Sequence, residues 1–305
     1  MTDDIAFDRS FALKPGVIDE VAPGVRRLLC DNPGPFTFKG TVSYIVGRGQ
    51  VAIVDPGPDN PRHVAALLDA VRNETVTHIF VTHTHADHSP AAATVKAATG
   101  AVTLGEGPHR PARALHLGEA NRLEASADRD FQPDHALADG EIIAVSGFAI
   151  EAVATPGHTA NHMAFALCGT DILFSGDHVM GWNTSIVAPP DGAMSDYMAS
   201  LDKLTRRSEQ RYLPGHGGEI REALPYVRQY IAHRHGREAA ILGHLQTGSA
   251  DIPQLVNAIY VGLDPRLAGA AALSVFAHLE DMVTDGRVAT EGPPALASTY
   301  RLRRR

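Results

Sequence analysis

The strongest constraint on this chain is a dense group of ligand-type side chains within one short segment. Residues 82–88 contain an H-x-H-x-D-H pattern, and its members are His83, His85, Asp87 and His88. The apolar run 76–81 before the pattern predicts a buried strand. Side chains on a helix or strand point in directions fixed by periods of about 3.6 or 2.0 residues, so these groups can converge only from a loop. The sequence therefore predicts a rigid strand that ends in a chemically active loop.

Three further clusters place a glycine beside a ligand at the end of an apolar run. They read PGHT at 156–159, SGDH at 175–178 and PGHG at 214–217, and they supply His158, Asp177 and His216. Imidazole and carboxylate groups are the ligands that borderline and hard divalent metals prefer. A solvated polar turn would explain a single H-x-H, but it does not explain four such clusters in one chain. We therefore expect a centre for two adjacent metal ions.

The four clusters and the earlier segment Val54-Asp55-Pro56-Gly57 resemble, in order, the five motifs of the metallo-β-lactamase superfamily. The resemblance covers residues from about 20 to about 220. It implies a first metal held by His83, His85 and His158. It implies a second metal held by Asp87, His88 and His216, with the carboxylate of Asp177 bridging both ions. Asp55 would orient a ligand by a hydrogen bond from outside the metal shell, and His178 is not a ligand in the family pattern.

Such a centre predicts hydrolysis. Two divalent ions that share a carboxylate lie roughly 3.5–4 Å apart and can clamp a nucleophile and a developing oxyanion together. A zinc-bound water has its pKa lowered to about 7, so hydroxide is available to attack an acyl carbon or a phosphorus. Asp87 is the candidate catalytic residue. We expect two zinc ions, because the ligand set has five histidines and no sulfur, although manganese and iron also accept such a set.

The order of expected elements fits two sheets packed face to face with helices outside. We expect strands at 42–54 (two, around a glycine turn), 142–145, 148–153, 163–167 and 172–174, and helices at 63–71 and 89–99. Ser89 is the expected N-cap of the second helix. Residues 104–138 are polar and have no assigned structure. The fold class is thus α/β, an αββα sandwich, which is also what the resemblance implies.

The composition changes after His216, and we divide the chain into a metal-hydrolase domain at 1–221 and a C-terminal domain at 222–305. The second part predicts a helix with Tyr226, Tyr230, Ile241 and Leu245 on one face, then helices near 252–259 and 267–284, and two short strands at 287–290 and 298–302. Three helices with a β-wing predict a winged helix. This part resembles the C-terminal domain of the β-lactamase-like protein 2 subfamily, whose members include a mitochondrial endoribonuclease. The stretches 155–162 and 176–182 also resemble that subfamily.

RNA is an alternative partner that the sequence leaves open. Residues 222–305 hold nine arginines and eight acidic residues, and Arg301, Arg303, Arg304 and Arg305 lie in the last five positions. A face that reads phosphates normally carries a basic stripe, and the predicted helix 267–284 shows none. Packing on the metal domain is the competing role for the winged helix. Trp182, the single tryptophan, either walls a substrate pocket or fills the sandwich core.

Three functions therefore remain: hydrolysis of a small acyl substrate (thioester, ester or lactone), cleavage of single-stranded RNA, or non-catalytic regulation by a winged helix on a vestigial metal fold. Complete ligand clusters argue against the third. The chain has only two cysteines, an acidic start and no apolar run of about 20 residues, so we expect a cytoplasmic protein without a membrane span. The summed charge of −8 argues against a general polyanion binder. The pattern does not set the substrate or the oligomeric state.

Overall fold

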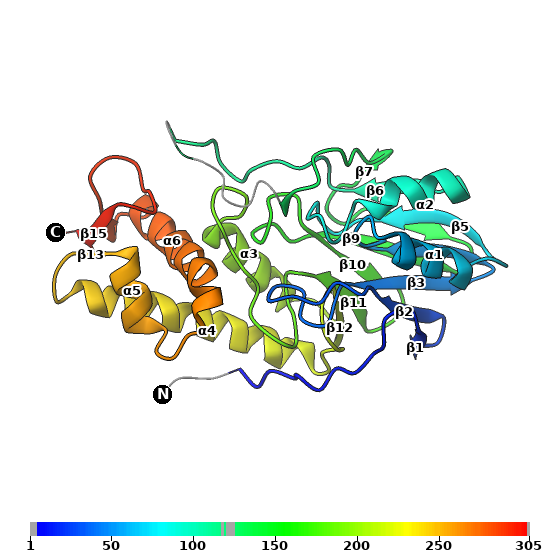
Figure 1. Ribbon diagram of the computed structural model, residues 1–305, viewed down its shortest axis with the longest axis horizontal. Coiled ribbons are helices and arrows are strands. Elements are labelled where there is room, and N and C mark those ends of the chain that lie inside the picture. Colours follow the sequence, from blue (N-terminus) through cyan, green and yellow to red (C-terminus); the bar gives the residue numbers. More distant parts are fainter. Residues whose placement is uncertain (1–4, 117–118, 120–125, 304–305) are drawn as a thin grey trace.

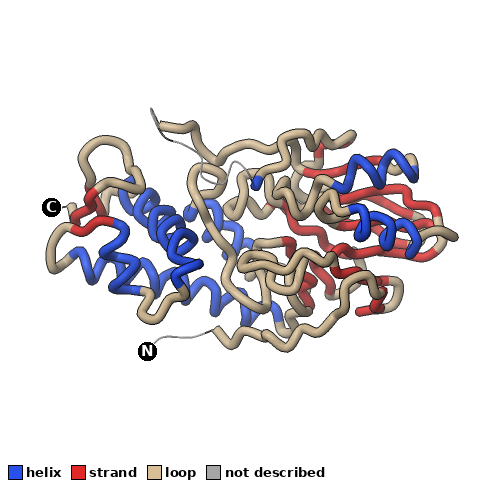
Figure 2. The backbone as a smooth tube through the Cα atoms, in the orientation of Figure 1, coloured by secondary structure: helices blue, strands red, loops and turns tan. Residues whose placement is uncertain are grey.

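The computed structural model describes residues 5–116, 119 and 126–303, and its framework is a pair of facing sheets (Figures 1 and 2). The first sheet has the order β1 (Ile18–Ala22), β2 (Val25–Leu29), β3 (Val42–Arg48), β4 (Gln50–Val54), β5 (Thr75–Phe80), β6 (Val102–Gly105) and β7 (His135–Ala136). The second has the order β12 (Arg211–Pro214), β11 (Ile172–Gly176), β10 (Met163–Leu167), β9 (Phe148–Ala154) and β8 (Ile142–Val145). β1 to β4 pair antiparallel, whereas β4 to β7 pair parallel.

The main core fills the space between the sheets. Alternate residues of a strand point to opposite faces, so Ala52 and Val54 of β4 face the second sheet while Val51 and Ile53 face outward. Both faces of β4 are buried, because helices cover its outer side. Aromatic rings join the sheets, with Phe80 and Phe165 at a centroid distance of 5.1 Å.

Helices cover both outer faces and complete the predicted αββα sandwich. α1 (Pro61–Ala70) and α2 (Ala91–Thr99) pack on the first sheet, and α3 (Met194–Leu204) packs on the second. The predicted N-cap of α2 is wrong: Pro90 is the N-cap, without a side-chain hydrogen bond. Ser89 instead donates its hydroxyl to the carboxylate of Asp128 at 2.6 Å, a charge-assisted bond that is stronger than a cap to a backbone amide.

The C-terminal part is a winged helix, as predicted. It contains α4 (Ala223–Leu245), α5 (Ile252–Ile259), the short 3₁₀ helix η2 (Pro265–Leu267), α6 (Ala268–Thr284) and a small sheet of order β13 (Ala250–Asp251), β15 (Thr299–Leu302) and β14 (Val288–Ala289). The two predicted wing strands pair, with Val288 opposite Leu302, and β13 adds a strand that the sequence did not predict.

Helix α4 belongs to two cores. Val227 and Tyr230 in its first half pack with α3 and the second sheet, whereas Ile241 and Leu245 in its second half pack with α5 and α6. The chain division at 221 therefore stays a prediction. The segment that had no assigned structure contributes β7, and its Arg113 forms ion pairs with Glu119 and with Glu280 of α6. Across the described ranges, no helix is both long enough and apolar enough to span a bilayer.

Candidate metal centre

All predicted ligands lie at one edge of the sandwich, on loops that follow strands of both sheets. The H-x-H-x-D-H loop follows β5 of the first sheet, while the loops after β9, β11 and β12 of the second sheet carry the other three ligands. Ligand atoms lie within 4.8 Å of one another inside each of three groups. We call His83–His85–His158 the first group and Asp87–His88–His216 the second group, and His83–His88–Asp177 connects the two. The structure therefore brings together every residue that the sequence predicted as a ligand.

In the first group, three ring nitrogens face one another. Nε2 of His83 lies 2.9 Å from Nδ1 of His85, and Nε2 of His158 lies 3.0 Å from the same atom. His158 donates from Nδ1 to the carbonyl of Ile186 at 2.6 Å, so its Nε2 carries a lone pair when the ring is neutral. Because the Nδ1 proton of His85 can satisfy only one neighbour, this cluster of acceptors fits a cation.

The tautomer of His83 follows from a short chain of hydrogen bonds. Thr82 donates its hydroxyl proton to Oδ2 of Asp55 at 2.7 Å. Nδ1 of His83 lies 3.0 Å from that hydroxyl oxygen and must therefore donate to it. The free lone pair of His83 is thus on Nε2, the atom that faces the other ligands.

In the second group, two imidazoles again turn lone pairs inward. His88 donates from Nδ1 to Oδ2 of Asp55 at 2.8 Å, and His216 donates from Nδ1 to the carbonyl of Gly40 at 3.2 Å. Their Nε2 atoms lie 3.3 Å apart. Oδ2 of Asp87 lies 3.5 Å from Nε2 of His88 and 3.1 Å from Nε2 of His216.

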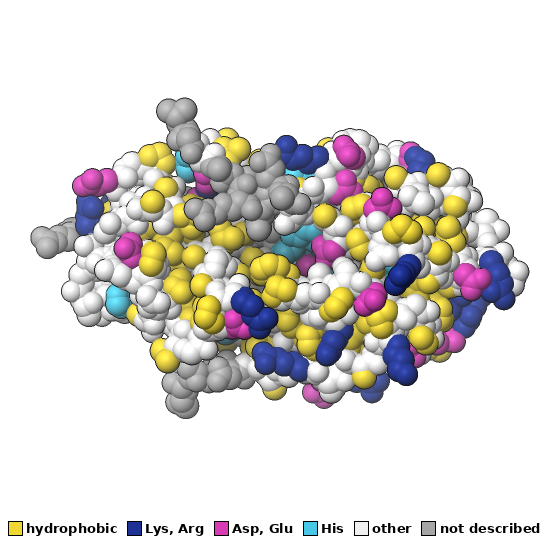
Figure 3. All heavy atoms as spheres, viewed as in Figure 1, with side chains coloured by type: hydrophobic (Ala, Val, Ile, Leu, Met, Phe, Trp, Pro, Cys, Tyr) yellow, Lys and Arg dark blue, Asp and Glu magenta, His cyan; other side chains and the backbone are white. Residues whose placement is uncertain are grey.

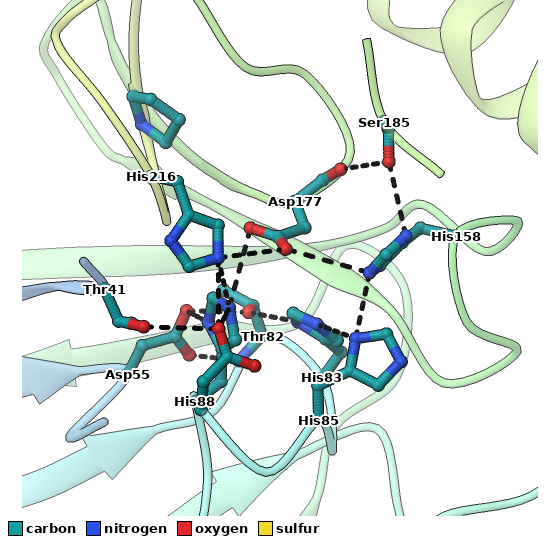
Figure 4. Close-up of polar contacts among 12 residues, drawn as sticks. Thr41, Asp55, Thr82, His83, His85, His88, His158, Asp177, Ser185 and His216 are labelled. Atoms are coloured by element: carbon teal, nitrogen blue, oxygen red, sulfur yellow. Dashed lines mark hydrogen bonds and ion pairs between the residues drawn. The ribbon is translucent and has the colours of Figure 1, made fainter. Parts of the chain in front are cut away.

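Asp177 lies between the two groups (Figure 4). One carboxylate oxygen is 3.5 Å from Nε2 of His88, and the other is 3.3 Å from Nε2 of His216 and 3.8 Å from Nε2 of His158. This is the location that a shared ligand requires. His178, next in the chain, belongs to none of the three described ligand groups.

Burial and charge divide the five histidines into two classes. Burial lowers the pKa of His85 to about 3, and burial together with neighbouring imidazoles lowers the pKa of His83 and His158. Burial also acts to lower the pKa of His216, but the carboxylates of Asp177 and Asp87 outweigh it and raise the pKa to about 10. The pKa of His88 rises for the same reason. The two carboxylates therefore stabilise a positive charge at the second group, and either a proton or a metal ion can carry that charge.

Asp55, for which the resemblance implied an orienting role, contacts His88 and Thr82. It is buried and has a positive φ of 49°, which lets the chain turn sharply after β4. Its Oδ1 accepts the backbone N–H of Thr82 at 2.7 Å, and its Oδ2 accepts from His88. One carboxylate thereby fixes a ring of the second group directly and His83 of the first group through Thr82.

Three supporting residues escaped the sequence reasoning. Thr41 donates to Oδ2 of Asp87 at 3.2 Å. His162 accepts the backbone N–H of Asp177 at 3.2 Å. Ser185 donates to the backbone carbonyl of Asp177 at 2.5 Å. Only His162 had a visible signal, since it closes the stretch 155–162 that resembled the subfamily.

A buried arginine of the winged helix joins this support. Arg234 of α4 is 2% exposed and donates to the backbone carbonyl of Ser185 and, at 3.3 Å, to the hydroxyl of Ser274. Its guanidinium lies over the ring of Tyr197 at 4.9 Å. The hydroxyl of Ser185 is also 3.3 Å from Nδ1 of His158. The C-terminal part therefore contacts the loop that supports the metal centre.

Trp182 lies on that same loop and lines a cavity of about 370 Å³ between the loop and the C-terminal helices. Its ring stacks on Phe38 with a centroid distance of 4.9 Å. Of the two roles that the sequence left open, the structure supports the pocket wall, because the sandwich core lies elsewhere.

Comparisons with known proteins agree with this geometry. Residues 36–216 match the Metallo-beta-lactamase superfamily, and residues 252–293 match the Beta-lactamase associated winged helix domain. The chain is 31% identical over 279 residues to the Beta-lactamase-like protein 2 homolog of Caenorhabditis elegans, covering 89% of this chain and 88% of that protein. It is 30% identical over 287 residues to the Atrochrysone carboxyl ACP thioesterase AacuM of Aspergillus aculeatus, covering 89% and 85%. A metallo-beta-lactamase family protein from Thermus thermophilus has a similar crystal structure, with a TM-score of 0.75 and 25% identity, over 93% of this chain and 100% of that one.

Proposed function

The chain belongs to the metallo-beta-lactamase superfamily, and from this premise we propose that it is a dinuclear metal-dependent hydrolase of a small acyl substrate, namely a thioester, an ester or a lactone. The observation that carries the proposal is the convergence of acceptor atoms from four loops at one edge of the sandwich. The first ion would be held by His83, His85 and His158, the second by Asp87, His88 and His216, and Asp177 would touch both. When bound, the ions would supply a nucleophile at neutral pH and neutralise charge on the substrate oxygen.

The protein's own residues hold this centre in one geometry. Asp55 fixes the ring of His88, and Thr41 holds one oxygen of Asp87. The side chain of Asp87 is 28% exposed, far more than that of Asp177 at 8%, so it is the carboxylate that a substrate can reach more easily. We therefore assign the catalytic role to Asp87. Nitrogen and oxygen ligands without sulfur favour zinc, and manganese and iron remain compatible.

An acyl substrate fits better than RNA because the arginines of the winged helix do not form a basic stripe: two of them pair with acids, and Arg234 is buried. Arg287 pairs with Glu238 and Asp285, and Arg266 pairs with Asp264. The relative named as a thioesterase supports the same choice. We further propose that residues 222–305 form a packing domain. Two unpaired cysteines support a cytoplasmic location.

The test is a panel of substrates offered to the metal-reconstituted chain: a neutral thioester, an ester, a lactone and single-stranded RNA. We expect two ions per chain by elemental analysis, and acyl turnover that chelation abolishes and metal restores. His85→Asn should remove turnover, whereas His235→Asn, an exposed histidine of α4, should leave it unchanged. Preferential cleavage of RNA would replace the acyl proposal with the nuclease. Ester turnover that survives metal removal and His85→Asn would contradict the mechanism.

A further inference from the structure

The cavity beside Trp182 lies between the support loop of the metal centre and the C-terminal helices. Its walls include Phe36, Trp182, Ile186, Arg234, Arg237 and Tyr260. A volume of about 370 Å³ is within the range of small-molecule sites. Hydrophobic side chains gather on this face of the molecule, next to histidine atoms (Figure 3). The cavity is therefore large enough for a ring or a short acyl chain and is lined mainly by apolar groups.

Two arginines of α4 give this apolar cavity an unusual charge. Arg237 donates to the backbone carbonyl of Ile259 at 3.3 Å and lies over the ring of Tyr260 at 4.4 Å. The Nε atoms of Arg234 and Arg237 are buried and have no hydrogen-bond partner among the described residues. Within the described part of the chain, no acidic side chain lines the cavity or pairs with either guanidinium. Arg234 is 2% exposed and Arg237 is partly buried. A buried cation without a counter-charge is costly, so this pair of guanidinium groups favours binding of an anion.

Neighbouring histidines respond to the same positive charge. Burial, and then the charges of Arg234 and Arg237, lower the pKa of His233 to about 4 and that of His278 to about 3. Both rings are therefore neutral at physiological pH. The cavity keeps two fixed positive charges and has no titrating histidine to change them.

The cavity also adjoins the metal centre through shared residues. Ser185 and Ile186 line it, and these two residues contact Asp177 and His158 by the hydrogen bonds described above. A ligand in the cavity would therefore lie against the loop that supports both groups of metal ligands.

We propose that this cavity is the subsite for a carboxylate carried on an aromatic or other apolar body, the acyl part of the substrate. The carboxylate is placed against the guanidinium groups of Arg237 and Arg234, and the apolar body against Trp182, Phe36 and Tyr260. This proposal rests on the proposed function only in taking the bound carboxylate compound to be the substrate that is hydrolysed. Binding itself follows from the cavity and its charge.

The single tryptophan makes binding directly measurable. The fluorescence of Trp182 is titrated with 3-phenylpropionate and with its neutral partner 3-phenylpropan-1-ol. We expect the carboxylate to bind at least about tenfold more tightly, as a charge-assisted hydrogen bond in a desolvated site provides. Arg237→Gln should erase this preference, and Arg237→Lys should keep part of it. Arg228→Gln, an exposed position of the same helix, should retain it in full.

Equal affinities of the two ligands, or fluorescence that does not respond to either, would refute the subsite. Arg237→Lys is the charge-keeping control for Arg237→Gln. If the folded Arg237→Gln protein keeps its preference for the carboxylate while the folded Arg237→Lys protein loses it, the charge argument is contradicted. Circular dichroism of each variant identifies the folded ones.

Kinetics then identify which part of the substrate carries the anion. Three thioesters are compared: a neutral acyl group on a neutral thiol, a carboxylate-bearing acyl group on that thiol, and the neutral acyl group on a phosphate-bearing thiol. In the native protein we expect the lowest KM for the second thioester. In Arg237→Gln, the ratio of its KM to the KM of the neutral thioester should rise by about tenfold. Preference for the third alone would assign the cavity to the thiol part and overturn our assignment. Carboxylate binding without any thioester hydrolysis would instead contradict the proposed function and leave the subsite standing.

Discussion

The two ligand groups of the metal centre share one loop and one edge of the sandwich, yet their surroundings act on them in opposite ways. In the first group, burial and neighbouring imidazoles keep His83, His85 and His158 neutral. In the second, Asp87 and Asp177 hold the pKa of His88 and His216 well above the ordinary value. The first group is therefore ready to bind a cation at neutral pH, whereas the second must first release protons. Asp177 is the residue through which the two are coupled.

The largest effect is expected from breaking that coupling. Asp177→Asn leaves the shape of the side chain but removes the charge that both groups contact. Turnover should fall on the order of a thousandfold or more, because both ions would be held less tightly and a loss of several kcal/mol corresponds to such a factor. Elemental analysis should find fewer than two ions per chain. Asp171→Asn, an exposed acid just before β11, is the matched control and should change neither quantity. Two fully retained ions in Asp177→Asn would exclude a shared ligand.

A change confined to the second group should separate the two. Asp87→Ala removes a carboxylate that contacts His88 and His216 but belongs to no first-group cluster. We expect kcat to fall by a factor of about a hundred to a thousand, since a ligand that is also the assigned catalytic carboxylate is lost. One ion should remain, held by the first group. Loss of both ions would indicate that the second group also maintains the first.

The pH dependence of metal binding should differ between the groups. The pKa of His216 is raised to about 10, so in the metal-free chain this ring is protonated below that pH and a metal ion must displace the proton. Affinity at the second group should therefore rise with pH from about 6 to about 10, by up to about a hundredfold per pH unit if His88 and His216 both release a proton. Burial lowers the pKa of His85 to about 3, so the histidines of the first group should release no proton in this range. Calorimetry in buffers of different ionisation enthalpy counts the protons, and equal release by both ions would contradict the assignment.

A region could be predicted from the sequence where its contacts form between residues close together along the chain, and was missed where they form between distant residues. The candidate ligands could be identified because each lies in a short motif at a strand end, where local pattern is visible, while their assignment to two metals came from the family resemblance. Strands β1 and β2 were missed because charges interrupt their apolar pattern: Arg27 pairs with Asp19, and Arg26 pairs with Glu74, which lies 48 residues away. Thr41 and Arg234 were missed because their partners Asp87 and Ser185 lie 46 and 49 residues away along the chain, where no local pattern reveals the contact.

Helix α4 offers a way to weaken the first group from a distance. Arg234→Met keeps much of the side-chain volume but removes the donors to Ser185 and Ser274. Because Ser185 contacts Asp177 and lies beside His158, we expect kcat to fall by about tenfold, as for other residues outside the metal shell. Arg228→Met on the exposed side of α4 is the control. An effect on KM alone, with kcat and metal affinity unchanged, would limit Arg234 to the cavity.

The smallest effect is expected at the end of the chain. Replacing Arg301, Arg303, Arg304 and Arg305 by Ser should leave metal content, acyl turnover and thermal stability unchanged, because Arg301 and Arg303 are exposed. Arg304 and Arg305 lie outside the described residues. Deleting residues 222–305 should instead aggregate the protein, since it removes Val227 and Tyr230 from a core shared with α3.

An RNA-binding role of the winged helix predicts that the serine replacements do have an effect. RNA affinity would then fall steeply with salt, by roughly 0.7 log units per log unit of salt for each phosphate contact on a single strand, and the serine variant would flatten that slope. A steep slope in the native chain that disappears in the variant would move the winged helix from packing to nucleic-acid recognition.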